Sequence, residues 1–183
     1  MITSDETSKI LQMHENISIY SPWSDGKIFH RIIDELSAPY MNIQVDKVVG
    51  PEARGFILGS AVAYKLNAGF VLVRKENKMF QYDYPKDLVY LERCIDYSGK
   101  EKGLEIDRTA SGIEKGDRVL IIDDWFGTGG QGLASIKLVE QVGGEVVGVG
   151  IILDDMSKEI QTKFKNYNLH SLIRRDPDET TDQ

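Results

Sequence analysis

Short apolar runs recur through the middle of the chain, and each ends at a glycine or at charged residues. Runs of this length with apolar residues on both faces are typical of buried strands in a parallel sheet. We predict four such strands, at 47–50, 69–73, 118–124 and 145–153. Two antiparallel strands joined by a long polar connection are predicted near 88–94 and 102–107, and a short strand at 17–20.

Apolar residues at helical spacing between these strands predict helices. The expected helices are 6–15, 27–37, 56–66 and 133–142. Breaking residues support two of their ends, since Pro39 follows the second helix and Gly143 follows the last. Strands that alternate with helices favour an α/β fold, with an open, twisted, mainly parallel sheet and helices on both faces.

A length of 183 residues suggests one domain. We expect a small N-terminal hood at about 1–40, a core at about 41–173, and a polar tail at 174–183 that frays. The segment 79–117 differs from the rest in its polar character, which is typical of a functional or disordered connection.

Charge and composition narrow the possible partners. The formal net charge is −7 and the isoelectric point is about 5.0, which argues against nucleic acid because its binding needs a basic surface. Cys94 is the only cysteine, so the chain cannot form an internal disulfide, as expected in a reducing compartment. No signal-like or membrane-spanning apolar segment occurs, and we expect a cytoplasmic protein.

The strongest functional signal follows the predicted strand 118–124. Asp123 and Asp124 end this strand, and a glycine-rich segment then opens a helix. The segment contains Gly127, Thr128, Gly129, Gly130 and Gln131. Glycines let backbone amides approach an anion, and a helix N-terminus adds about half a positive charge. An acid pair would repel phosphate but accepts hydrogen bonds from ribose hydroxyls, so the combination predicts a ligand with both a ribose and a phosphate. The alternative is an ordinary strand-to-helix turn with solvated acids.

A second candidate loop follows the strand 47–50. Arg54 lies there beside a glycine, and its planar guanidinium can clamp a pyrophosphate. Arg74, Lys75 and Lys78 add positive charge after the neighbouring strand. The alternative is that these four side chains are solvated charges at strand ends.

The segment 119–132 resembles the signature of the type I phosphoribosyltransferases: four apolar residues, two acids, two variable residues, then small-Thr-Gly-small. Gln131 stands where the family usually has a hydroxyl residue. The segments 48–56 and 70–78 resemble the adenine phosphoribosyltransferase branch, and the resemblance covers about 45–155. It implies that the two acids bind the ribose hydroxyls of phosphoribosyl pyrophosphate and that the glycine loop holds its 5-phosphate. It also implies a non-proline cis peptide near Glu52–Ala53.

This resemblance implies transfer of a 5-phosphoribosyl group to a purine base, with adenine the leading acceptor. Mg²⁺ is expected to be held mainly by substrate, with Asp123 and Asp124 nearby. Family habit further implies a homodimer and a flexible catalytic loop, in which Glu92 is the matching acid for proton transfer. The alternative for Glu92 is an ordinary loop carboxylate.

Base recognition is the least determined part of the site. Phe29 and Trp125 are candidates to stack on the base, while Trp125 and Phe126 occupy positions that are often Leu-Leu in the family. These two aromatics either reshape the pocket or pack on the sheet. Alternative readings of the whole chain are a transferase for xanthine, guanine or another base, a non-catalytic sensor of phosphoribosyl pyrophosphate, and a diphosphokinase-like protein.

Overall fold

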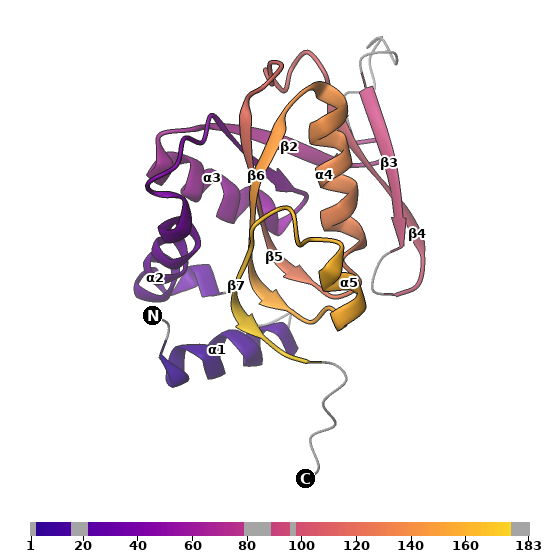
Figure 1. The fold of residues 1–183 in the computed structure, drawn as a ribbon. Helices are drawn as coiled ribbons and strands as arrows, with labels where there is room; N and C mark the ends of the chain where they lie inside the picture. The colour runs from indigo at the N-terminus through magenta and orange to yellow at the C-terminus, as the bar shows by residue number, and fades with distance from the viewer. Residues whose placement is uncertain (1–2, 16–21, 79–88, 96–97, 177–183) are drawn as a thin grey trace.

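The computed structural model describes residues 3–15, 22–78, 89–95 and 98–176, and the chain folds around one seven-stranded sheet (Figure 1). The strand order is β3-β4-β2-β1-β5-β6-β7. The strands are β1 (Lys47–Pro51), β2 (Gly69–Lys75), β3 (Val89–Ile95), β4 (Glu101–Asp107), β5 (Arg118–Phe126), β6 (Glu145–Asp154) and β7 (Leu169–Arg174).

The sheet is parallel over five strands and antiparallel at one end. β2, β1, β5, β6 and β7 pair in parallel, so their carboxyl ends share one edge. β4 pairs antiparallel with β2, and β3 pairs antiparallel with β4 along its whole length. The β3–β4 hairpin therefore lies beside the edge where ligands bind in folds of this kind.

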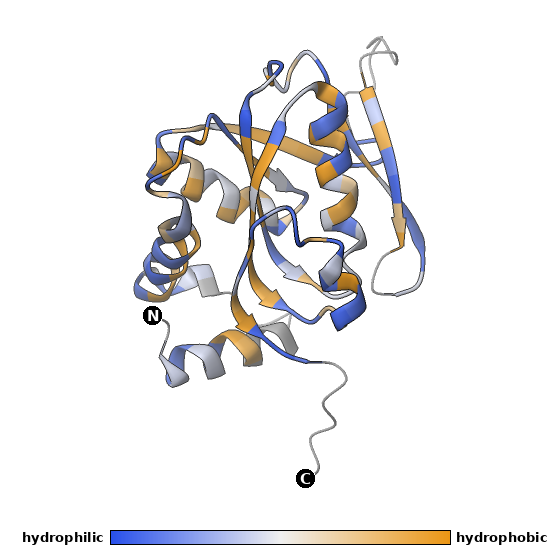
Figure 2. Cartoon of the chain, in the orientation of Figure 1, coloured by the Kyte–Doolittle hydropathy of each residue, from blue (hydrophilic) through white to orange (hydrophobic). Residues whose placement is uncertain are grey.

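Helices cover both faces of the sheet (Figure 1). The helices are α1 (Ser4–Glu15), α2 (Gly26–Ser37), α3 (Arg54–Leu66), α4 (Gly130–Val142) and α5 (Lys158–Thr162), with short 3-10 turns at Pro22–Ser24 and Ala38–Tyr40. Side chains of α2 and α3 join the hydrophobic core on one face, and those of α4 join the core on the other. Figure 2 shows the resulting pattern, with apolar strands in the middle of the molecule.

The sequence of the central strand β5 is continuously apolar because both of its faces are covered. Val119 and Ile121 pack toward α4, while Leu120 and Ile122 pack toward α2 and α3. All four side chains are fully buried. A strand covered on both faces cannot alternate with polar residues, so the apolar run is the direct consequence of its central place.

Local signals set the helix limits. The Asp25 carboxylate accepts hydrogen bonds from the backbone of Lys27 (2.9 Å) and Ile28 (3.2 Å), which caps the start of α2. α4 ends at Gly143, whose φ of 105° lies in the left-handed region that glycine adopts without strain.

The predicted α/β fold is confirmed, and the predicted elements agree with those observed to within a few residues. α5 and β7 were missed: α5 has only five residues, and β7 is an edge strand whose residues are mostly half-buried, so neither carries a strong periodic pattern. The strand expected at 17–20 lies outside the described residues. The polar tail was expected to begin at Arg174, but the structure places Arg174 in β7, while 177–183 lie outside the described residues.

No helix in the described part of the chain is long and apolar enough to cross a membrane.

Candidate functional site

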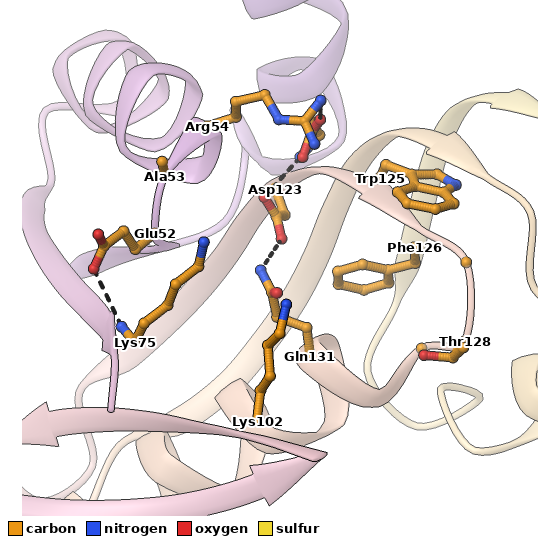
Figure 3. Close-up of a pocket in the computed structure, with 13 residues that line it drawn as sticks. Glu52, Ala53, Arg54, Lys75, Lys102, Asp123, Trp125, Phe126, Thr128 and Gln131 are labelled. Carbon is orange, nitrogen blue, oxygen red and sulfur yellow. Dashed lines mark hydrogen bonds and ion pairs between the residues drawn. The ribbon is translucent and has the colours of Figure 1, made fainter. Parts of the chain in front are cut away.

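A cavity of about 220 Å³ opens at the carboxyl ends of the parallel strands (Figure 3). It brings together the two loops singled out in the sequence, which follow β1 and β5, with residues from β2 and β4. Its lining residues are Glu52, Ala53, Arg54, Lys75, Lys102, Asp123, Asp124, Trp125, Phe126, Gly127, Thr128, Gly129 and Gln131. Cationic, acidic, aromatic and glycine residues therefore meet in one space.

The acid pair has defined partners inside this cavity. Asp123 accepts hydrogen bonds from the Gln131 side chain (3.0 Å) and from the Asp124 backbone (2.9 Å). Asp124 forms an ion pair with Arg54 at 2.8 Å. Gln131, which replaces the usual hydroxyl residue, thus contacts the acid pair in this structure.

Asp123 is only 2% exposed. Burial, and secondly the neighbouring charge of Asp124, raise the pKa of the Asp123 carboxyl well above its ordinary value. Arg54 opposes this rise but does not cancel it. A buried carboxyl held by two donors is a rigid acceptor for a ligand hydroxyl.

The glycine loop is shaped for close approach. Gly129 has a φ of 69° and, as the residue that precedes α4, carries no side chain of its own to cap the helix. A Cβ on Gly127 would lie 2.7 Å from the Trp125 ring, and one on Gly130 would lie 2.6 Å from the Ile95 carbonyl oxygen. Side chains are therefore excluded, which leaves the backbone amides and the helix N-terminus to face an anion.

The Thr128 hydroxyl donates a hydrogen bond to the Ile95 carbonyl oxygen at 3.0 Å and accepts one from the Gly130 backbone at 3.3 Å. The end of β3 therefore contacts the glycine loop directly. A phosphate that used the Thr128 hydroxyl would have to replace the Ile95 carbonyl as its acceptor.

The loop after β1 organises the other side of the cavity. Its peptide bond between Glu52 and Ala53 is cis, as predicted. The Glu52 carboxylate accepts hydrogen bonds from the Lys75 backbone (3.2 Å) and from Arg74 (3.4 Å). These bonds tie the loop to the end of β2, while the Lys75 ammonium group extends toward the cavity (Figure 3).

Five of the residues singled out in the sequence do not line the cavity. Glu92 faces α4, where it binds Gln141 (2.6 Å) and Lys137 (3.5 Å). Phe29 lines a separate groove between α2 and α3. The remaining three are Arg74, Lys78 and Gly130.

The two aromatic residues after the acid pair have different surroundings. Phe126 is 1% exposed and packs on Phe164 with ring centroids 5.6 Å apart. Trp125 is half-buried, and its indole N–H donates to Asp155 at 2.8 Å. Phe126 thus belongs to the core on the α4 face, whereas Trp125 packs against the core on the other face and makes a polar contact at the rim.

Sequence reasoning did not single out Glu52 or Lys102 for the site. Lys102 comes from β4, which is distant in sequence from both loops, and reaches the cavity only because β4 pairs with β2. Glu52 lay within the recognised loop, and its place between Gly50 and Arg54 could have marked it.

Comparison with known proteins identifies the family. A model of the phosphoribosyl transferase domain matches residues 25–182. Adenine phosphoribosyltransferase from Clostridium botulinum is 39% identical over 150 residues, which are 82% of each chain. The structure of adenine phosphoribosyltransferase from Rhodothermus marinus superimposes with a TM-score of 0.71 at 35% identity, covering 84% of this chain and 82% of the other. That of the Giardia lamblia enzyme complexed with 9-deazaadenine gives 0.72 at 29% identity, with 84% and 82% covered.

The domain match and the alignments span most of the chain and include both loops of the cavity. The chain therefore belongs to the type I phosphoribosyltransferase family, in its adenine phosphoribosyltransferase branch.

Proposed function

We propose that the protein transfers the 5-phosphoribosyl group of phosphoribosyl pyrophosphate to adenine, giving a nucleoside 5′-monophosphate and pyrophosphate in purine salvage. The observation that carries this proposal is the single cavity that joins the acid pair and the glycine loop to Arg54, Lys75 and Lys102. The relatives described above are adenine phosphoribosyltransferases, and one of them binds 9-deazaadenine.

The arrangement of charges supports one orientation of the sugar phosphate. The 5-phosphate fits the glycine loop at the start of α4, where backbone amides and the helix dipole favour an anion. The ribose hydroxyls would then donate to Asp123 and Asp124. The pyrophosphate would lie toward Arg54 and Lys75, on the opposite side of the cavity from Trp125 (Figure 3).

Arg54 can serve the leaving group without abandoning the acid pair. One of its terminal nitrogens pairs with Asp124 at 2.8 Å, and a guanidinium carries several N–H donors in a fixed plane. The reaction breaks the bond between the anomeric carbon and the pyrophosphate oxygen, which leaves with the bonding electrons. Positive groups fixed near that oxygen stabilise the charge that develops on it.

Mg²⁺ fits the donor chemistry of the cavity as an ion carried mainly by substrate. Among the described residues, no cluster of three or more His, Cys, Asp or Glu side chains could hold a metal. Asp123 and Asp124 are hard oxygen donors, and Mg²⁺ commonly binds through one or two carboxylates together with substrate phosphates. When bound, Mg²⁺ would offset the negative charge of the pyrophosphate.

The adenine nitrogen that attacks the anomeric carbon must also lose a proton. We propose Glu92 for proton transfer, on the family pattern alone. In this structure Glu92 binds Gln141 and Lys137 on α4, so it would have to exchange these partners before it could act in the cavity.

Release of pyrophosphate from phosphoribosyl pyrophosphate and Mg²⁺, measured with adenine, hypoxanthine, guanine and xanthine in turn, tests the proposal. We expect release with adenine and a kcat/KM for adenine that exceeds those for the other bases. Preference for a different base would overturn the choice of adenine. Tight ligand binding without release for any base would instead support the sensor.

We further propose one domain, with residues 1–40 as a hood over the core, and a cytoplasmic homodimer. The family membership supports these points. Sedimentation at several protein concentrations tests the dimer, and a single monomeric species at all of them would exclude it.

A further inference from the structure

Three side chains form a row at the edge of the sheet where the cavity lies. Trp125 comes from the end of β5, Asp155 follows β6, and Arg175 follows β7. The indole N–H of Trp125 donates to Asp155 at 2.8 Å. Arg175 donates to both oxygens of the same carboxylate, at 2.8 and 2.6 Å.

The register of the sheet places these residues side by side. The Asp155 backbone donates to the Phe126 carbonyl at 2.9 Å, and the Arg175 backbone donates to the Asp154 carbonyl at 2.9 Å. Because β5, β6 and β7 are neighbours and parallel, their ends carry the three side chains in order. The row is therefore fixed by the backbone.

Trp125 is the member of the row that lines the cavity. Its ring lies so close to Gly127 that a Cβ at that glycine would be 2.7 Å from the ring. The indole also packs against the hydrophobic core on the α2 and α3 face, so the glycine loop, Asp155 and that core together confine it. Rotation of the ring would break its hydrogen bond or press it against the loop.

The chemistry of the row favours a fixed ring. An indole N–H can only donate, and a carboxylate is its strongest common acceptor. The Asp155 side chain is 15% exposed, and the two-pronged contact with Arg175 both balances its charge and sets its plane. The leucines common at this position in the family could make no such bond.

We propose that Asp155 and Arg175 are positioning residues that hold the Trp125 indole as a flat apolar wall against which the purine base stacks. This inference rests on the proposed function, because it assigns the base to the Trp125 side of the cavity. Neither residue touches the substrate, and both act through the indole.

Fluorescence of Trp125 tests the positioning without any substrate. The chain has two tryptophans, so Trp23→Phe leaves Trp125 as the only one. In that background, Asp155→Ala should raise acrylamide quenching of Trp125 by about twofold and shorten its anisotropy decay, because the ring is released. Asp155→Asn keeps an acceptor oxygen and should fall between Asp155→Ala and the parent. Quenching and anisotropy unchanged in both variants would overturn the proposal.

Kinetics then test the consequence for the base. An immobilised side chain in a binding site changes affinity by about three- to tenfold, so Asp155→Ala should raise KM for adenine by that factor. KM for phosphoribosyl pyrophosphate should stay within about twofold. An equal rise in both KM values, or an unchanged KM for adenine, would overturn the proposal.

Arg174→Lys is the matched control, since Arg174 pairs with Asp154 at 2.7 Å and not with Asp155. It should leave Trp125 fluorescence and KM for adenine unchanged, whereas Arg175→Lys should shift both in the direction of Asp155→Asn. If Asp155→Ala does not fold, as judged by thermal melting, Asp155→Asn and Arg175→Lys carry the test. Absence of wild-type turnover with adenine would reject the proposed function, while the fluorescence still decides the positioning.

Discussion

Replacement of Asp123 by asparagine separates the two consequences of burying an acid in a binding cavity. The change keeps the size of the side chain and removes its negative charge. The hydrogen bond from the Asp124 backbone can remain, and the Gln131 amide can turn to present its oxygen to the new amide. We expect the variant to bind phosphoribosyl pyrophosphate more weakly and yet to be more stable at neutral pH.

The expected gain in stability follows from the direction of the pKa shift. Burial holds the pKa of Asp123 above its ordinary value of 3.8, so the folded protein keeps this proton to a higher pH than the unfolded chain. Stability therefore falls as pH rises from about 4 toward the folded-state pKa of Asp123. Asparagine cannot ionise, so the melting temperatures of variant and wild type should coincide near pH 4 and diverge in favour of the variant by pH 7.

The loss of binding can be estimated from the room left around the carboxyl. Asp123 is 2% exposed and both oxygens already accept a hydrogen bond, so we count a single bond to a ribose hydroxyl. A hydrogen bond to a charged group contributes about 1–1.5 kcal/mol more than a hydrogen bond between neutral groups. A change of about 1.4 kcal/mol corresponds to a tenfold change in affinity. The kcat/KM for phosphoribosyl pyrophosphate should therefore fall about five- to twelvefold.

Steady-state pyrophosphate release and thermal melting between pH 4 and pH 8 check both effects. Asp46→Asn is the control of opposite sign, because a backbone hydrogen bond from Arg118 lowers the pKa of half-buried Asp46. Loss of the Asp46 charge should therefore destabilise the protein at neutral pH. A kcat/KM of Asp123→Asn within about twofold of wild type would refute the ribose contact. A melting temperature below that of wild type at pH 7 would refute the cost assigned to the buried charge.

Three further substitutions probe the glycine loop, the cation that the sequence did not single out, and the proposed acid. A residue with a Cβ costs about 1–2 kcal/mol in the left-handed conformation that Gly129 adopts. Gly129→Ala should lower the free energy of unfolding by more than this, because its Cβ would also lie 2.6 Å from an Ile160 methyl group. Thermal or urea unfolding measures the change. Lys102→Met should raise KM for phosphoribosyl pyrophosphate about two- to fivefold, because it removes one exposed ion pair with the ligand. Initial-rate kinetics measure this change. If Glu92 transfers the proton, Glu92→Gln should lower kcat about a hundredfold with little change in stability. Turnover at saturating substrate concentrations measures kcat.

Each substitution has its own control or contrary outcome. Gly116→Ala is the control for Gly129→Ala, because Gly116 also has a left-handed φ, of 89°, but no atom lies within 4 Å of the new Cβ. An equal loss of unfolding free energy in both variants would exclude a steric contribution at Gly129. Lys100→Met removes a nearby exposed charge that does not line the cavity, and an equal effect there would remove Lys102 from the site. Full turnover by Glu92→Gln would exclude Glu92 from the chemistry.

Sequence pattern alone determined most of the fold. The apolar runs of β1, β5 and β6 are continuous because both faces of these strands are covered. A continuous apolar run therefore predicts a buried strand even when the covering helices are unknown. The acid pair and glycine loop were recognisable for a similar reason, since strand, turn and helix follow one another in the chain. The edge strand β7 was missed because its half-buried residues carry no clear alternation.

Only the tertiary structure decided which distant residues share the cavity. Lys102 enters it because β4 pairs with β2, and Glu92 binds α4 because β3 packs against that helix. The different surroundings of Trp125 and Phe126, adjacent and chemically alike, likewise depend on partners from β6 onward. Strand pairing and side-chain direction are set by contacts between segments far apart in sequence, so a local pattern can identify the chemistry of a site but not all the residues that complete it.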